Sequence, residues 1–398
     1  MKKQSIIVLL MLLGLSSMSI AQTSKAEVKQ NFKPSPTNQN GKEYPMVNSE
    51  GRVRAKVFAP DAKYVQLDIG AVKYDLVKDE EGFWIGESEP QDEGFHYYQL
   101  NIDGASVPDP GSKYFYGAGR WGSGVEVPAY DNEKYAFKNV PHGTVSEHIF
   151  YSEINESMKR TFVYTPPGYE ENTNKRYPVL YLQHGGGENE FGWPSQGKTN
   201  LIMDNLIAEG KAVPFIIVMS DGNWFRPRPP VNEEEDGEEN EEEEERPRQW
   251  PPQGWADGFK NTLINEIIPM IDKKYRTIAD QDHRGMAGLS MGGMQTRAIT
   301  LPNSDVFSQV GMFSGGSISP EDVEANPEFK ENIDLLFISY GSSELGGGRG
   351  FGGDPKENTD KLGEMGLNTH FYVSPETAHE WQSWRRSLYE FAQLAFQD

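Results

Sequence analysis

A G-x-S-x-G pattern, Gly288-Leu289-Ser290-Met291-Gly292, follows the apolar-leaning run of residues 284–287 and constrains the fold more than any other feature of this chain. The pattern predicts that a strand ends, the chain turns sharply, and the hydroxyl group of Ser290 is exposed before a helix begins. The flanking glycines are required because side chains in so tight a turn would collide with their neighbours. Such a turn can also be purely structural, so a catalytic interpretation needs a base, an acid and an oxyanion hole in the right chain order.

Strand and helix patterns alternate over residues 150–398, which predicts an α/β domain. Near-continuous apolar runs are typical of parallel strands that helices cover on both faces. A doubly wound, mostly parallel sheet of the α/β-hydrolase type accounts for this order. The apolar runs occupy residues 178–182, 215–219 and 335–338, and the helical patterns occupy residues 201–208, 259–275, 291–301 and 380–396.

Short strand patterns without a helical period fill the region before this domain. They predict a small β-sandwich over residues 45–125, punctuated by the turns Glu81-Gly82 and Asp103-Gly104. A linker is expected over residues 126–149. The expected strands are residues 53–58, 64–69, 83–85 and 96–102.

The first residues have the pattern of a secretory signal peptide. Lys2 and Lys3 precede a short apolar core at residues 6–15, and Ser19-Ile20-Ala21 forms a small-residue cleavage site. We therefore expect residues 1–21 to be removed on export to the periplasm or the medium. The polar, proline-containing residues 22–44 are expected to be a flexible lead-in, and no other segment is apolar enough to anchor the chain in a membrane.

Composition excludes several classes of function. The chain has no cysteine, which excludes disulfides, thiolate metal sites, a cysteine nucleophile and a lipoprotein anchor. Its formal net charge of −22 argues against nucleic acid as a partner. Residues 226–252 form an acidic low-complexity insert, in which like charges indicate a solvated loop and the ligand spacing of a calcium site is missing. No metal ion or cofactor is expected.

A histidine is the side chain suited to activating a serine near neutral pH, and the chain has seven. Three lie in or near the N-terminal part, His184 is better explained as structural, and His283 would lie at the far end of the nucleophile strand. His370 falls inside a strand pattern. His379 follows the loop of residues 374–378 and precedes the last helix, which is where a hydrolase base belongs.

The acid that orients this histidine should lie on the loop after the strand that ends near residue 340. Glu344 comes first on that loop, and Asp354 is the reserve. The oxyanion hole needs backbone N–H groups, and one is expected from Met291 at the start of a helix. The other is expected from Gly186 or Gly187, in the glycine-rich loop after the strand of residues 179–183.

A set of motifs runs through the region from about residue 140 to the C-terminus. They are Tyr164-Thr165-Pro166-Pro167-Gly168-Tyr169, residues 177–182, His184-Gly185-Gly186-Gly187-Glu188, residues 202–206, residues 288–293, and His379-Glu380-Trp381 with Trp384-Arg385. These motifs are similar to those of carbohydrate esterase family 1, which contains feruloyl and acetyl-xylan esterases. The resemblance implies that Ser290 is the nucleophile and His379 the base; the family usually has aspartate where this chain has Glu344.

A second resemblance concerns the predicted sandwich. It rests on five short segments: Phe58-Ala59-Pro60-Asp61-Ala62, Glu81-Gly82-Phe83-Trp84, Tyr97-Tyr98, Asp103-Gly104 and Asp109-Pro110. They resemble the early-set immunoglobulin-like domain associated with carbohydrate-binding module family 48. That family does not always bind sugar, so the domain is expected either to bind glycan or to serve as a packing module.

Together these features predict an exported serine esterase that releases feruloyl or acetyl groups from plant polysaccharides such as xylan. Four tryptophans are candidates to stack on the acyl group or a sugar ring: Trp193, Trp224, Trp255 and Trp381. A siderophore (enterobactin-type) esterase and an acyltransferase are alternative enzymes. A carbohydrate-binding protein with an inactive hydrolase domain is the alternative outside enzymes.

Overall fold

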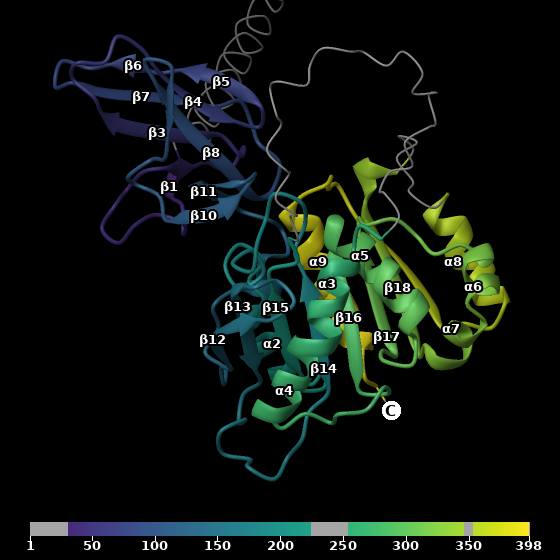
Figure 1. The fold of residues 1–398 in the computed structure, drawn as a ribbon. Coiled ribbons are helices and arrows are strands. Elements are labelled where there is room, and N and C mark those ends of the chain that lie inside the picture. Colours follow the sequence, from purple (N-terminus) through teal and green to yellow (C-terminus); the bar gives the residue numbers. More distant parts are fainter. Residues whose placement is uncertain (1–30, 224–253, 346–352, 398) are drawn as a thin grey trace, which may run out of the picture. The chain divides into compact units, whose positions relative to one another are not determined.

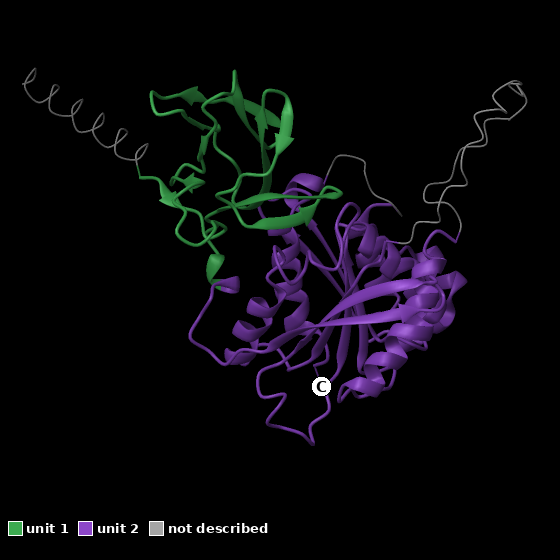
Figure 2. Cartoon of the chain, turned by 60° about the vertical axis from the view of Figure 1, so that its left-hand side comes forward, with its two compact units in different colours: residues 1–133 green, residues 134–398 purple. Residues whose placement is uncertain are grey.

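The computed structural model describes residues 31–223, 254–345 and 353–397 of the chain. Contacts within the chain define two units, Met1–Glu133 and Lys134–Asp398, which Figure 2 shows in separate colours. The expected signal peptide (residues 1–21) and the acidic insert (residues 226–252) lie outside the described residues. No helix within the described ranges has both the length and the apolar character that crossing a membrane requires.

The first unit consists of two antiparallel sheets that share one hydrophobic core. The strands are β1 (Lys33–Pro34), β2 (Met46–Val47), β3 (Val53–Phe58), β4 (Val65–Ile69), β5 (Val72–Asp75), β6 (Val77–Lys78), β7 (Phe83–Glu87), β8 (Gly94–Ile102), β9 (Ala105–Val107), β10 (Tyr114–Gly117) and β11 (Arg120–Val127). One sheet has the order β1-β2-β3-β7-β6, and the other has the order β10-β11-β8-β4-β5 with β9 beside β8. Val53, Ala55 and Val57 of β3 are buried and the residues between them are partly exposed, because successive side chains of a strand point to opposite faces.

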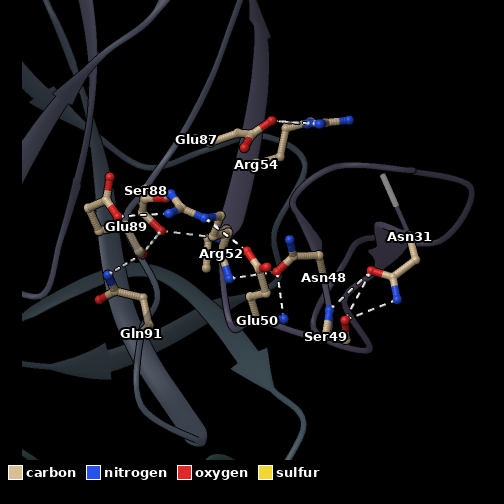
Figure 3. A network of polar contacts seen from close by, with 11 residues as sticks. Asn31, Asn48, Ser49, Glu50, Arg52, Arg54, Glu87, Ser88, Glu89 and Gln91 are labelled. Carbon is tan, nitrogen blue, oxygen red and sulfur yellow. Dashed lines mark hydrogen bonds and ion pairs between the residues drawn. The ribbon is translucent and has the colours of Figure 1, made fainter. Parts of the chain in front are cut away.

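Residues 31–44, which were predicted to be part of a flexible lead-in, are a folded part of the first unit. Strand β1 lies in this segment and pairs with β2. The side-chain oxygen of Asn31 accepts a hydrogen bond from the backbone N–H of Ser49 at 3.3 Å (Figure 3). Close by in the same view, the guanidinium group of Arg52 donates to the carboxylate of Glu89 at 2.9 Å. The polar composition of residues 31–44 therefore reflects hydrogen bonding within the unit and does not mark a free tail.

Strands β10 and β11 were not predicted, because glycines interrupt their apolar alternation. A Cβ atom at Gly117 would lie 2.1 Å from the ring of Tyr97, and one at Gly122 would lie 2.1 Å from the side-chain nitrogen of Gln99. Both glycines therefore let side chains of β8 lie across the neighbouring strands, a close approach that marks glycine within strands.

The second unit is built around one mixed sheet of eight strands. The strands are β12 (Thr144–Ser152), β13 (Ser157–Thr165), β14 (Val179–Gln183), β15 (Ile216–Ser220), β16 (Arg284–Leu289), β17 (Gln309–Phe313), β18 (Leu335–Gly341) and β19 (Thr369–Ser374). The helices are α2 (Thr199–Ala208), α3 (Asp257–Thr262), the π-helical turn η2 (Leu263–Ile267), α4 (Ile268–Lys274), α5 (Met291–Thr300), α6 (Pro320–Ala325), α7 (Pro327–Asn332), α8 (Pro355–Glu364) and α9 (Trp381–Leu394). In the sheet order β12-β13-β15-β14-β16-β17-β18-β19, the pairs β12–β13 and β13–β15 are antiparallel and the other pairs are parallel.

Helices cover both faces of this sheet, as a doubly wound fold requires (Figure 1). Met312 of β17 packs in one core cluster with Val323 of α6 and Leu362 of α8. The next residue, Phe313, points to the opposite face, where its ring centroid lies 5.9 Å from that of Phe391 in α9. The sheet is therefore buried on both faces. Because its central strands are parallel, their carboxyl ends lie at one edge of the sheet.

The predicted α/β architecture is confirmed in its coarse form, but the mixed sheet has strands that the sequence did not predict. Strand β12 begins at Thr144, inside the expected linker of residues 126–149, and β11 extends to Val127. Strand β17 was missed because Gln309 and Gly311 interrupt its apolar run.

Candidate active site

Ser290 occupies a strained turn between β16 and α5. Its backbone dihedral φ is 50° and ψ is −116°, values that a non-glycine residue adopts only when the surrounding structure enforces them. A Cβ atom at Gly288 would lie 2.5 Å from the backbone carbon of Gly292, so the turn closes only around glycine at this position. The N–H group of Ser290 donates to the carbonyl oxygen of Phe313 at 2.8 Å and fixes the turn to the neighbouring strand β17.

Three side chains from separate loops meet at this turn. The Nε2 atom of His379 lies 2.9 Å from the Oγ atom of Ser290, and its Nδ1 atom lies 2.7 Å from the Oε1 atom of Glu344. Glu344 follows β18 and His379 follows β19, at the carboxyl ends of the parallel strands. A carboxylate can only accept, so Nδ1 carries the proton and Nε2 is free to accept the hydroxyl proton of Ser290. The His379 side chain remains 48% exposed, so a substrate can approach it.

The side chain of Glu344 is only 13% exposed, and both of its carboxylate oxygens accept hydrogen bonds. Its Oε2 atom accepts the N–H of Gly341 and the hydroxyl of Ser314, each at 2.7 Å. Burial by itself raises the pKa of Glu344, but the hydrogen bonds from His379, Gly341 and Ser314 outweigh it and lower the pKa below its usual range. Glu344 is therefore held as a carboxylate beside the imidazole.

The reserve acid, Asp354, lies elsewhere and has a structural role. It is the N-cap of α8, where its Oδ1 atom accepts the N–H of Glu357 at 2.8 Å. The structure thus brings Glu344, and not Asp354, to His379. The described ranges contain no group of three or more His, Asp or Glu side chains that could hold a metal ion.

The glycine-rich loop after β14 lies against the Ser290 turn. A Cβ atom at Gly185 would lie 3.2 Å from the Cβ of Ser290, and one at Gly186 would lie 4.0 Å from the Cβ of Met291. Gly187 has a φ of 76°, in the left-handed region that glycine adopts freely. Met291 begins α5, so its N–H has no carbonyl partner within the helix. Backbone amides of the two expected oxyanion segments therefore lie in the same neighbourhood.

His184 supports this loop through hydrogen bonds of its two ring nitrogens to backbone groups of Gly185 and Gly222. Its ring is buried, its Nδ1 atom lies 2.8 Å from the carbonyl oxygen of Gly185, and its Nε2 atom accepts the N–H of Gly222 at 2.9 Å. Because Nε2 accepts, Nδ1 is the donor and holds the loop carbonyl in place. This geometry agrees with the structural interpretation of His184.

The tryptophans expected in the substrate cleft do not share one environment. Trp193 and Trp381 are only 1% and 2% exposed, and their rings meet edge to face with centroids 5.4 Å apart. The indole N–H of Trp193 donates to the carbonyl of Gln183 at 2.8 Å. The expectation that these two rings stack on substrate is therefore wrong, since both belong to the core. Trp255 is partly exposed, and Trp224 lies outside the described residues.

Two neighbours of the site were not assigned roles from the sequence. Ser314 follows the unpredicted strand β17 and donates to Glu344. The indole of Trp384 donates to the hydroxyl of Ser314 at 3.1 Å, and its ring lies edge to face with His379 at a centroid distance of 5.2 Å. The only sequence signal for Trp384 is its place in the motif that begins at His379.

Similarity to known proteins covers both units in one relative and the second unit alone in a family model. Residues 152–346 match a family model described as putative esterases. A protein of Xylanibacter ruminicola named endo-1,4-beta-xylanase/feruloyl esterase is 43% identical over 376 residues, which are 92% of this chain and 48% of that protein. Endo-1,4-beta-xylanase Y of Acetivibrio thermocellus is 31% identical over 176 residues, which are 42% of this chain and 14% of that protein. The chain thus spans about half the length of the first relative and less of the second.

Solved structures support the resemblance to carbohydrate esterase family 1. A ferulic acid esterase of that family from Anaeromyces mucronatus superimposes with a TM-score of 0.51 at 25% identity, covering 67% of this chain and 96% of its own. The enterobactin esterase of Shigella flexneri gives a TM-score of 0.58 at 14% identity, covering 87% and 93%, which shows the fold alone. Residues 152–346 of the second unit thus match the family of putative esterases, and the unit is similar in sequence and fold to carbohydrate esterase family 1.

Proposed function

We propose that this chain is an exported serine esterase that hydrolyses feruloyl or acetyl esters on plant polysaccharides such as xylan. One observation carries the proposal: the Ser290 hydroxyl lies 2.9 Å from His379 Nε2, whose other ring nitrogen lies 2.7 Å from Glu344. This arrangement of nucleophile, base and acid is the one that acyl transfer requires. The name of the Xylanibacter ruminicola relative supports the choice of acyl group and polysaccharide.

In the proposed acylation step, His379 Nε2 removes the hydroxyl proton while Ser290 Oγ attacks the ester carbonyl carbon. Glu344 stabilises the imidazolium that forms. The N–H of Met291 and an N–H of Gly186 or Gly187 donate to the oxygen that becomes negative. Collapse of the tetrahedral intermediate breaks the ester bond, and the sugar hydroxyl leaves with the proton from His379.

The second proposed step returns the enzyme to its starting state. A water molecule gives a proton to His379 Nε2 and attacks the acyl group on Ser290. The acid is released, and Ser290 recovers its proton from His379. Ferulate or acetate and one free sugar hydroxyl are the products, so the two classes of ester differ only in what the acyl pocket accommodates.

Product release from feruloylated and acetylated xylan oligosaccharides tests this function. We expect ferulate or acetate to appear at a rate at least a hundredfold above that of a Ser290→Ala sample. Transfer of the acyl group to an added acceptor sugar would instead assign an acyltransferase. Hydrolysis of enterobactin with neither xylan ester cleaved would assign a siderophore esterase. Binding to xylan with no acyl release in any assay would leave the carbohydrate-binding alternative.

We further propose that the first unit is an early-set immunoglobulin-like sandwich that binds the polysaccharide. A pocket of about 110 Å³ lies on its six-stranded sheet and is lined in part by Asp68, Tyr97, Gln99 and Arg120. An aromatic ring beside groups that donate and accept hydrogen bonds is suited to a sugar. The glycines of β10 and β11 support the proposal, because they leave room for Tyr97 and Gln99.

A matched pair of aspartates tests this pocket. Asp68 lines it and accepts a hydrogen bond from Asn101 at 3.1 Å, whereas Asp75 on the adjacent strand accepts one from Gln66 at 2.8 Å outside it. In the Ser290→Ala background, Asp68→Ala should weaken retention on xylan by about tenfold, since a hydrogen bond to a charged group is lost. Asp75→Ala should leave retention unchanged. Equal retention of both variants would remove this pocket as the binding site.

A further inference from the structure

A chain of hydrogen bonds ends at the carboxylate of Glu344 and begins at a buried indole. The N–H of Trp384 donates to Ser314 Oγ at 3.1 Å, and Ser314 Oγ donates to Glu344 Oε2 at 2.7 Å. We infer that Ser314 and Trp384 are positioning residues that hold Glu344 in the orientation His379 needs. The inference rests on the proposed function of Ser290, His379 and Glu344, and it adds residues that act through Glu344 without touching substrate.

The direction of every bond in this chain follows from its two end groups, because an indole N–H can only donate and a carboxylate can only accept. An indole nitrogen is a donor only, so Ser314 Oγ must accept from Trp384. The single hydroxyl proton of Ser314 is then free to point at Glu344 Oε2. With Oε2 also accepting from Gly341, Oε1 remains for His379, whose Nδ1 must be the protonated nitrogen. Glu344 sets the tautomer that lets Nε2 act as a base, and the indole and the hydroxyl hold Glu344 in place.

The backbone at Ser314 supports a role for its hydroxyl. Its φ of 50° lies in the left-handed region, where glycine is favoured and serine is not. Its N–H donates to the carbonyl of Ser339 at 2.7 Å, and the N–H of Gly316 donates to the hydroxyl of Tyr340 at 2.9 Å. The loop is therefore held in place by strand β18. A strained serine kept beside Gly315 and Gly316 is explained if its side chain is required.

Glutamate at the acid position makes such a support more important. Its side chain has one more rotatable bond than that of aspartate, so an unsupported carboxylate would lose more conformational freedom on pairing with His379. Two donors on Oε2 fix this extra torsion before the imidazole becomes charged. Preorganisation of this kind affects the chemical step more than the binding of substrate.

Two substitutions at Ser314 separate the effect of losing the hydroxyl group from the effect of the strained backbone. Ser314→Ala and Ser314→Gly both remove the donor, but glycine fits a φ of 50° better and should unfold at the same or a higher temperature. We expect both variants to lower kcat by about tenfold, the scale of a lost hydrogen bond to a charged group, with KM changed less than twofold. The substrate is the xylan ester that the wild-type chain hydrolyses.

Trp384→Phe keeps an aromatic ring but replaces the larger indole and removes its N–H. We expect kcat to fall about threefold, because the Ser314 hydroxyl then loses its fixed direction. In the double variant Ser314→Ala/Trp384→Phe, kcat should be no lower than in Ser314→Ala alone, since both changes break one chain of bonds. Loss of the downfield proton resonance of His379 Nδ1–H in the single Ser314 variants would give an independent signature.

Controls come from groups of the same kind outside this chain of bonds. Ser387 is buried in α9 and donates to Ser383 at 2.8 Å, and the indole of Trp84 in the first unit donates to Ala59 at 2.9 Å. Ser387→Ala and Trp84→Phe should retain wild-type kcat. Wild-type kcat in Ser314→Gly, or multiplicative losses in the double variant, would overturn the inference. Full turnover in Ser290→Ala would instead overturn the proposed function, so the two failures are distinguishable.

Discussion

Replacing Ser290 by alanine is expected to lower kcat for ester hydrolysis by roughly 10⁵-fold, the scale on which serine hydrolases depend on their nucleophile. Its Oγ atom lies 2.9 Å from His379 Nε2, and alanine has no atom that could attack the carbonyl carbon. Alanine at a φ of 50° is strained to the same degree as serine, so the free energy of unfolding should change little. Ferulate or acetate release and a thermal unfolding curve measure the two quantities.

A second readout makes this result independent of substrate choice. A fluorophosphonate that reacts with activated serines should label the wild-type chain and Ser387→Ala, and should leave Ser290→Ala unlabelled. Residual turnover in Ser290→Ala above about one hundredth of the wild-type rate would show that the chemistry lies elsewhere, because only binding and the oxyanion donors would remain.

Replacing Glu344 by glutamine or alanine is expected to lower kcat by roughly 10³- to 10⁴-fold. Glutamine at this position can offer its amide N–H to His379, which would favour the wrong imidazole tautomer. Alanine leaves Nδ1 of His379 without its partner at 2.7 Å. In both cases KM should change less than kcat, because the carboxylate acts on the charge that develops during reaction.

Asp354→Ala is the matched control for the acid. It should retain wild-type turnover, but it removes the N-cap of α8 and should cost about 1 kcal/mol of unfolding free energy. A fall in turnover in Asp354→Ala with none in Glu344→Ala would reverse the assignment. The two variants therefore test the identity of the acid through opposite expected effects on activity.

Because the pKa of Glu344 is lowered, the effect of replacing Glu344 on the free energy of unfolding should depend on pH. A carboxyl group whose pKa is lower in the folded than in the unfolded state stabilises the fold above its unfolded value. That contribution is lost as the pH falls through the folded value. The difference in unfolding free energy between the wild-type chain and Glu344→Gln should therefore be largest near neutral pH and shrink in acid. Urea unfolding at several pH values measures it.

The sequence predicted the coarse fold well because most buried strands of an α/β sheet are short apolar runs. Strand β17 was missed because Gly311, whose Cβ would lie 2.8 Å from that of Ala287, breaks the run for a packing reason. The same cause hid β10 and β11, where Gly117 and Gly122 accommodate side chains of β8. Contacts between strands decide these positions, and a single chain segment does not display them.

The candidate site could likewise be predicted from the sequence only in part. The meeting of Ser290 and His379 could be predicted, because loops after parallel strands gather at one edge of a sheet. The choice between Glu344 and Asp354 depended on how a loop closes, and local sequence does not specify that. The role of Ser314 could not be predicted from the sequence, since this residue follows a strand that had not been recognised. The burial of Trp193 and of Trp381 was equally inaccessible, because tryptophan serves both cores and binding sites.

The start of the second unit decides where the chain can be divided for study. Tyr135 is buried there, donates to Gln382 in α9 at 3.0 Å, and lies under the guanidinium group of Arg385 at 4.7 Å from its ring centroid. A fragment that begins at residue 150 would lose this anchor and most of the edge strand β12. A fragment that begins at Lys134 keeps both, so the hydrolase should be expressed from there when the two units are to be separated.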